Sequence, residues 1–290
     1  MYSSHANNFD QIVAARRIAQ NQIVATRETA QNIGSIRTVR VGGLPVAIMD
    51  RLQTAHYTIE HAMAGKGSAR RCELHTTANG QVISLCASRP AVRRLYDQAD
   101  LISADGMSVV VASRLRCSSR LPERVATTDA FHDIAKVAAE RGATFYFLGS
   151  TQDTVERAVR RVLLLYPQLR VVGWHNGHFG AERDNEIGDM INEAAPDILW
   201  VGMGVPRQQE FVLGQRERWT NIGIAKTCGG LFDFLSGKNK RAPGWMQSVG
   251  LEWLYRAMLE PKRLGWRYLT TNPHAIYVMW TNSGEYPVRE

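Results

Sequence analysis

The sequence has few cysteines and no long apolar run, and both features narrow the class of protein. Its four cysteines lie far apart without a CxxC pair, which argues against a disulfide scaffold or structural zinc site and favours a reducing cytoplasm. The most apolar stretches, such as 144–148 and 162–166, span about five residues, whereas a membrane-spanning helix needs roughly 20. The sequence therefore argues against an integral membrane protein and leaves peripheral binding open.

Several catalytic and nucleotide-binding motifs are also missing. The chain has no GxGxxG with a downstream acid, no GxxxxGK[ST], no HExxH, no GxSxG and no DxD. These absences weigh against dinucleotide, P-loop, zinc-hydrolase and serine-hydrolase chemistry. A magnesium clamp needs carboxylates close together, and no such local set occurs. We therefore expect no cofactor and no metal, with arginines and helix N-termini stabilising any departing diphosphate.

The charge balance predicts an anionic partner. Lys and Arg number 35 against 27 Asp and Glu, a formal net charge of +8, which suits nucleic acid, a phosphorylated small molecule or a membrane surface. Residues 238–267 carry seven basic residues and two acidic ones, interleaved with tryptophan and leucine. Because this charge lies on an aromatic-rich segment rather than on a nucleic-acid-reading element, we expect no nucleic acid partner.

This basic stretch belongs to a predicted helical appendage over residues 236–290. Pro243 and Pro261 bracket one expected helix, and Pro273 is expected to follow a second. One interpretation is a basic amphipathic appendage that seeks a membrane. The other is a pair of ordinary helices that pack on the sheet and leave their charges in solvent.

Short apolar runs alternate with helical stretches from residue 39 onward. Predicted strands are 72–77, 143–148, 169–174, 197–201 and 222–227, and predicted helices are 49–64, 108–116, 129–141, 151–166, 183–194 and 207–220. Uniformly apolar strands separated by helices predict an α/β fold with a mostly parallel sheet covered on both faces. We assign this core to residues 39–235 and expect a flexible or helical N-terminal extension over residues 1–38.

Three predicted strands run into glycine, at 149, at 202 and 204, and at 229 and 230. The carboxyl ends of parallel strands form the ligand crevice of such a sheet, and glycine there lets backbone amides approach a phosphate. Each glycine alone could serve a tight turn. Together they predict a nucleotide or phosphate crevice.

Polar side chains that follow one further apolar run and one further predicted strand could carry chemistry. Asp105 ends an apolar run just before a predicted helix, where it either caps that helix or accepts a proton from a hydroxyl nucleophile. Thr77 and Asn79 end another strand and suit sugar hydroxyls, although such residues also form turns. Downstream, Arg124 is of the type that neutralises a departing diphosphate through bidentate contacts.

Several ordered motifs together resemble the WecG/TagA/CpsF family of glycosyltransferases over roughly residues 39–270. The motifs are ADGMSVV at 104–110, YFLG at 146–149, YP at 166–167, VGMGVPRQQE at 201–210, FD at 232–233, RAP at 241–243, GLEWLYR at 250–256 and EPKRL at 260–264. The resemblance implies a Rossmann-like core and a cytoplasmic enzyme peripheral to the inner face of the cell membrane.

The resemblance also implies an activity. Such enzymes move a sugar, with inversion and without a metal, from a UDP-sugar to a polyprenyl-diphosphate-linked saccharide in cell-surface polysaccharide biosynthesis. N-acetylmannosamine, its uronic acid and glucose all stay open as the donor sugar, because residues 124–128 lack the glycine that the family commonly has before Asp129. Assembly into homo-oligomers also stays open. The alternative is a non-catalytic module that binds a nucleotide sugar and docks on a membrane or a partner enzyme.

Site residues follow from the motifs that match. Asp105 corresponds to the catalytic base that deprotonates the acceptor hydroxyl. Substrate-binding residues fall at Thr77, Asn79, Arg124, Gln209, Arg256, Arg263 and Arg267. Among these, Arg124 and Gln209 resemble donor-site residues. The three arginines of the appendage resemble those that close over the donor diphosphate.

Overall fold

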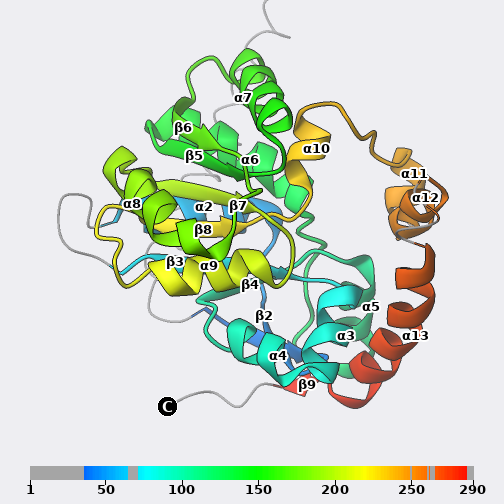
Figure 1. Cartoon of the computed structure of the whole chain (residues 1–290). Helices are drawn as coiled ribbons and strands as arrows, with labels where there is room; N and C mark the ends of the chain where they lie inside the picture. The colour runs from blue at the N-terminus through cyan, green and yellow to red at the C-terminus, as the bar shows by residue number, and fades with distance from the viewer. Residues whose placement is uncertain (1–35, 65–70, 249, 260, 262–264, 286–290) are drawn as a thin grey trace, which may run out of the picture. The chain divides into compact units, whose positions relative to one another are not determined.

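A six-stranded parallel sheet forms the centre of the protein (Figure 1). The computed structural model describes residues 36–64, 71–248, 250–259, 261 and 265–285, with the side chains of residues 248, 266 and 267 left out. Thr38–Glu290 forms one compact unit, separate from Met1–Arg37. Up to residue 35, the predicted N-terminal extension lies outside the described residues.

The sheet has the strand order β4-β3-β8-β7-β5-β6, and every pairing is parallel. Its strands are β3 (Glu73–Ala78), β4 (Leu101–Ala104), β5 (Thr144–Gly149), β6 (Arg170–His175), β7 (Ile198–Gly202) and β8 (Ile224–Thr227). Five of them lie within two residues of their predicted bounds, and the α/β fold class is confirmed. The sequence did not identify β4 as a strand, because a run of four residues is too short to separate from other apolar segments.

Helices connect the strands on both faces of the sheet. They are α2 (Arg51–Met63), α3 (Gly80–Ser88), α4 (Pro90–Tyr96), α5 (Met107–Arg116), α6 (Thr127–Arg141), α7 (Gln152–Leu165), η1 (Ala181–Arg183), α8 (Asp184–Ala194), α9 (Arg207–Gln215), α10 (Leu231–Leu235), α11 (Gly244–Ser248), α12 (Glu252–Leu259) and α13 (Trp266–Thr281). Side chains of Asp50, Asn79 and Thr151 accept first-turn N–H groups and so fix where α2, α3 and α7 begin. The sequence anticipated α2 and α5 to α9, but not α3 and α4.

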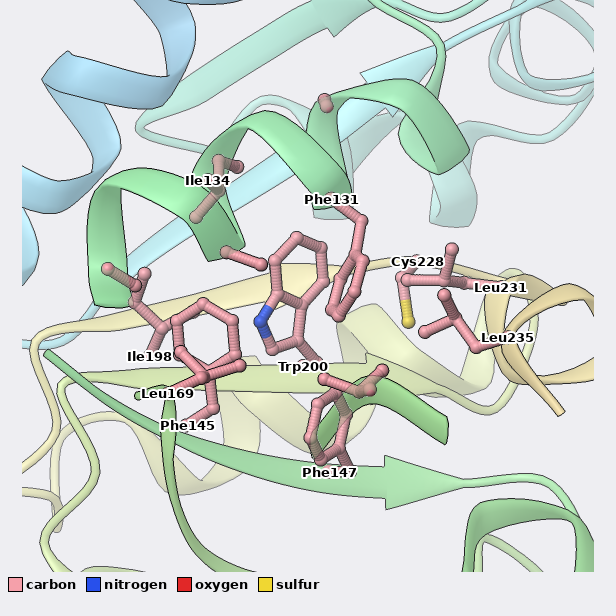
Figure 2. Close-up of a cluster of buried hydrophobic side chains, with 14 of the residues drawn as sticks. Phe131, Ile134, Phe145, Phe147, Leu169, Ile198, Trp200, Cys228, Leu231 and Leu235 are labelled. Carbon is pink, nitrogen blue, oxygen red and sulfur yellow. The ribbon is translucent and has the colours of Figure 1, made fainter. Parts of the chain in front are cut away.

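An aromatic cluster holds α6 against one face of the sheet (Figure 2). The Phe131 ring of α6 lies 4.9 Å from the Trp200 ring of β7 and 6.0 Å from the Phe147 ring of β5, between centroids. Helices α2, α7 and α10 add apolar side chains to the same cluster, whereas α8 and α9 cover the opposite face. Aromatic pairs at these separations add to the stabilisation from burial. The cluster therefore holds the first turns of α6 in place on the sheet.

A small antiparallel sheet and the last helix complete the protein. The sheet order is β2-β1-β9, formed by Leu44–Ala47, Thr38–Val41 and Gly284–Glu285. Helix α13 packs against α3 and α5, and its Ala275, Val278 and Met279 are buried in a core cluster shared with β1 and β4. Helix α13 is therefore built into a core. No described helix is long and apolar enough to cross a membrane.

Two predictions about the C-terminal segment are wrong. Between Pro243 and Pro261 the chain forms two helices, α11 and α12, rather than one. Pro273 lies inside α13 instead of following it. A proline inside a helix removes one backbone hydrogen bond. The buried apolar face of α13 supplies the packing that carries the helix past this position.

Candidate active site

The carboxyl ends of β3 and β4 bring three predicted site residues together. The strands are parallel neighbours with Ala78 opposite Ala104, so Asn79 and Asp105 follow at adjacent strand ends. The backbone N–H of Asp105 also donates to the carbonyl oxygen of Ala78 at 2.9 Å. Thr77 lies two residues before Asn79 and is partly exposed, so alternation along the extended chain points both side chains to the same side.

Asp105 does not cap the helix that follows it. Helix α5 begins after Gly106 without a side-chain cap, whereas Oδ1 of Asp105 accepts a hydrogen bond of 2.9 Å from the Thr127 N–H. Thr127 is the first residue of α6, so the carboxylate lies at the positive end of a different helix. The aromatic cluster beneath α6 thereby helps to hold Asp105 in place.

The surroundings of Asp105 suit a group that accepts a proton. Burial raises the pKa of this carboxyl above its usual value, and the nearby Glu252 carboxylate raises it further. The Thr127 N–H, the Arg124 guanidinium and a hydrogen bond from Asn79 act in the opposite direction, and the net pKa shift is upward. A half-buried carboxyl with a raised pKa is a stronger base than an ordinary aspartate.

Arg124 belongs to a ring of four alternating charges beside Asp105. Its Nη1 lies 3.0 Å from Glu252 Oε2, and its Nη2 lies 3.7 Å from Asp129 Oδ2. Arg241 closes the ring, because it pairs with Asp129 and lies 3.4 Å from Glu252 Oε2. Carboxylates of the protein thus hold the Arg124 guanidinium, and its contact with a substrate diphosphate stays a prediction.

A cavity of about 430 Å³ opens beside this ring. Its lining residues are Arg51, Met107, Val110, Arg114, Glu123, Arg124, Asp129 and Gln247. The wall from α5 contributes methionine and valine, and the rest is mostly charged. Such a lining suits a ligand that carries both an anionic and an apolar part.

The glycines at the ends of β5, β7 and β8 serve two different purposes. A Cβ on Gly149 would lie 2.4 Å from the Gly202 carbonyl oxygen, and one on Gly202 would lie 2.8 Å from the Gly229 carbonyl oxygen. Gly149 and Gly202 are therefore needed for close packing of neighbouring strand ends. Gly204 and Gly229 have φ values of +80° and +52°, and a Cβ there would meet nothing within 4 Å. These two leave room for a ligand to approach the backbone, as does Gly230, where the nearest atom to such a Cβ would be Asp233 Oδ2 at 3.9 Å.

Gln209 lies away from the exposed part of the site. Its side chain is fully buried under the sheet, where Nε2 donates to Thr76 Oγ1 at 3.2 Å and to the Tyr96 hydroxyl oxygen at 3.1 Å. Thr76 also accepts a hydrogen bond of 2.8 Å from the Thr227 hydroxyl. These contacts tie β3, β8, α4 and α9 together. A role for Gln209 in binding the donor stays a prediction.

The three predicted arginines of the C-terminal segment are only partly placed. Arg256 of α12 stacks over the Phe234 ring of α10, with its guanidinium carbon 5.5 Å from the ring centroid. Arg263 lies outside the described residues. Arg267 belongs to α13, but its side chain is not described. Their predicted contact with a diphosphate stays a prediction.

Three charged residues near the site were missed by sequence reasoning. Arg241 and Glu252 were noted only as parts of motifs, because partners separated by 112 and 128 residues in sequence meet only after folding. Lys226 lies inside β8, is 1% exposed, and has no hydrogen-bond partner for Nζ among the residues that the structure describes. The sequence signal that could have identified Lys226 is a charged residue inside a predicted buried strand.

Within the described part of the chain, no three His, Cys, Asp or Glu side chains gather where they could hold a metal ion. The reaction's independence of metal stays a prediction, with Arg124 and its neighbours as the candidate charge-balancing groups.

Comparisons with known proteins identify a family and several relatives. A family model described as "Glycosyl transferase WecG/TagA/CpsF family" matches residues 39–286. A relative from Bacillus subtilis (strain 168) is 31% identical over 186 residues, covering 64% of this chain and 70% of the relative. One from Bacillus spizizenii is 30% identical over 200 residues, covering 69% and 76%. One from Staphylococcus aureus (strain NCTC 8325 / PS 47) is 30% identical over 189 residues, covering 65% and 73%. All three are named N-acetylglucosaminyldiphosphoundecaprenol N-acetyl-beta-D-mannosaminyltransferase.

Proposed function

Because the chain belongs to the WecG/TagA/CpsF family and is a glycosyltransferase, we propose that it transfers a sugar from a UDP-sugar to a polyprenyl-diphosphate-linked saccharide. The names of its relatives favour N-acetylmannosamine as the sugar and an undecaprenyl-diphosphate-linked N-acetylglucosamine as the acceptor. The observation that carries the proposal is the half-buried Asp105 carboxyl beside the Arg124 guanidinium.

The proposed reaction is a single displacement. The acceptor hydroxyl oxygen forms a bond to the anomeric carbon of the donor sugar, and Asp105 takes the hydroxyl proton. The bond between that carbon and the diphosphate oxygen breaks on the opposite face, so UDP leaves with the electron pair and the configuration inverts. Arg124 balances the negative charge that develops on the diphosphate. Thr77 and Asn79 flank Asp105 and would hold sugar hydroxyls.

The cavity lined by Arg124 and Asp129 supports a lipid-linked acceptor. Its arginines would hold a diphosphate, and Met107 and Val110 would contact the first isoprene units. On this basis we assign the isoprenoid chain of the acceptor to the cavity and the nucleoside of the donor to the glycine-lined strand ends at Gly204 and Gly229.

A transfer assay with defined donors tests the function. We expect the purified protein to move a sugar from one UDP-sugar to a short-chain polyprenyl-diphosphate N-acetylglucosamine, followed by mass spectrometry. UDP-N-acetylmannosamine, its uronic acid and UDP-glucose are compared, each with EDTA present. Absence of transfer from every donor, with divalent metal restored and further acceptors tried, would refute the proposal and favour the nucleotide-sugar-binding module.

The C-terminal helices support a peripheral position at the cytoplasmic face of the membrane. Large apolar side chains of α12 and α13 are exposed at Trp253, Leu254, Met258, Leu259, Leu269, Ile276, Tyr277 and Trp280. Within α13, the spacing of Leu269, Ile276 and Trp280 places them on one stripe. The Arg116 guanidinium stacks over Trp280 at 4.8 Å from the ring centroid, so positive charge borders this apolar surface. Such a surface suits an anionic bilayer.

Charge placed on this stripe should release the protein from vesicles. We expect Leu269→Asp combined with Ile276→Asp to lower the partition coefficient on phosphatidylglycerol vesicles at least about tenfold, because each side chain contributes on the order of 1.5–3 kcal/mol when buried. Both side chains are exposed, at 71% and 63%, so the fold should tolerate the change. The matched control is Leu164→Asp combined with Leu165→Asp on α7, where both side chains are exposed, at 81% and 61%, and lie outside the stripe. Equal flotation of the double variant and the wild type would contradict the proposal.

A further inference from the structure

The ring of Arg124, Asp129, Arg241 and Glu252 is assembled from separate segments. Arg124 and Asp129 flank the start of α6, and Arg241 lies in the loop after α10. Glu252 is the first residue of α12 and the one member contributed by a C-terminal helix. All four side chains are largely buried, with exposed fractions between 12% and 25%. Ion pairs at this depth are screened less than pairs on the surface.

Glu252 is the member of the ring that can leave most easily. Helix α12 has no buried residue, and its contacts with the rest of the protein include the Glu252 ion pairs, Arg256 over Phe234, and Trp253, whose ring lies 5.7 Å from the Tyr268 ring of α13. The chain enters it through Gly250, whose φ is +77°. By contrast, Asp129 lies in the first turn of α6, which the aromatic cluster holds to the sheet. A helix with so little buried surface detaches at low cost in free energy.

Without Glu252, the remaining three side chains form a cationic site. Two guanidinium groups would then face one carboxylate, next to Asp105, whose pKa responds to both Arg124 and Glu252. Arginine binds phosphate oxygens through two parallel N–H donors, and a diphosphate carries more negative charge than the single carboxylate it would replace.

We propose that Arg124 and Arg241 together form a diphosphate-binding site, and that the Glu252 carboxylate occupies this site until a substrate diphosphate displaces it. The inference rests on the proposed function and extends it, because it adds Arg241 as a binding residue and Glu252 as an internal competitor. The diphosphate can come from the nucleotide sugar or from the lipid acceptor, since both present the same group. The binding experiment below distinguishes these two sources.

Removal of the Glu252 charge should tighten diphosphate binding. We expect Glu252→Gln to lower the Kd for inorganic pyrophosphate and for UDP or geranyl diphosphate about fivefold or more, measured by calorimetry. A gain for UDP alone assigns the site to the donor, and a gain for geranyl diphosphate alone assigns it to the acceptor. In the same assay, Arg241→Gln should weaken the affinity that Glu252→Gln improves.

The control removes the same charge elsewhere. Asp189 of α8 lies outside the site, with its Oδ1 2.8 Å from Nη2 of Arg218. Asp189→Asn therefore tests whether a change in net charge alone tightens binding. Unchanged or weaker affinity in a folded Glu252→Gln protein would overturn the proposal, as would equal gains in the two variants. Calorimetry with pyrophosphate needs no sugar transfer. The diphosphate site can therefore fail while transfer succeeds, or hold while transfer fails.

A pH profile separates displacement from a structural role. In the free enzyme the Glu252 charge raises the pKa of Asp105, so Glu252→Gln should move the acidic limb of kcat/KM to lower pH. A variant that merely loosens α12 would lower activity without moving that limb. An acidic limb that stays in place would contradict the placement of Glu252 beside the catalytic carboxyl.

Discussion

Asp105→Asn should lower the turnover of sugar transfer by about 10²- to 10⁴-fold, the usual range for loss of one general base. Asparagine has nearly the same shape, and its oxygen can still accept the hydrogen bond that the Thr127 N–H donates at 2.9 Å. It cannot take a proton from the acceptor hydroxyl. We therefore expect kcat to fall while the Kd for UDP changes little, measured with the purified variant by product formation and calorimetry.

The control for this variant is another aspartate at a helix start. Asp50 accepts the Gln53 N–H at 2.7 Å and so caps α2, much as Asp105 accepts the first N–H of α6. Asp50→Asn should cost a similar amount of stability and leave turnover nearly unchanged. If Asp105→Asn turns over like the wild type, or if Asp50→Asn loses as much activity, then Asp105 is not the base.

The pH dependence of the wild type gives a second readout of the same group. Transfer needs Asp105 ionised, so kcat should fall as the pH drops through its pKa. Burial raises that pKa, so the acidic limb should lie at higher pH than the ordinary titration of an aspartate. An acidic limb at or below the usual aspartate range would contradict the assignment.

The sheet could be predicted because its central strands β5 and β7 are apolar on both faces. Every residue of β5 and β7 is buried, and such runs stand out between helices with polar faces. The antiparallel sheet could not be predicted in the same way. Its strands β1 and β9 pair in space but are the first and last strands along the described chain. Gly284–Glu285 also carries no strand pattern of its own. Such pairing depends on tertiary contacts that local sequence does not encode.

The sequence identified Asn79 and Asp105 as candidate site residues, but their proximity became clear only with the structure, because β4 was not predicted as a strand. Asn79 and Asp105 each end an apolar strand, and in a parallel sheet such ends share one edge. The ring around Arg124 depends instead on how a loop and two later segments fold back, so Arg241 and Glu252 carried no local mark as its partners. The motif at 201–210 identified Gln209 as a candidate site residue. Its burial against Thr76 of β3 could not be predicted, because it depends on α9 packing on the sheet face that α2 does not cover.

Lys226→Met should stabilise the protein by about 3 kcal/mol at pH 7. Lys226 is 1% exposed, and its register opposite Trp200 and His75 places it in a row with two other buried nitrogen-bearing side chains. Burial lowers the pKa of its ammonium group from 10.5 to about 8. Each unit of pKa shift corresponds to about 1.4 kcal/mol. At pH 7 Lys226 is charged in the folded protein, so the whole shift lowers the free energy of unfolding, by about 3 kcal/mol. Methionine has a similar volume and removes the charge.

The sign of the pH dependence makes this prediction specific. Between pH 8 and 10.5 the unfolded chain holds a proton on Lys226 that the folded protein has lost, so its contribution to stability rises with pH in that window. The gain from Lys226→Met, measured by urea unfolding, should therefore be full below pH 8 and shrink toward pH 10.5. Lys136→Met on the exposed side of α6 should change stability by less than about 0.5 kcal/mol at every pH. A loss of stability in Lys226→Met, or a gain independent of pH, would mean that the ammonium has a partner in the folded protein that offsets its burial.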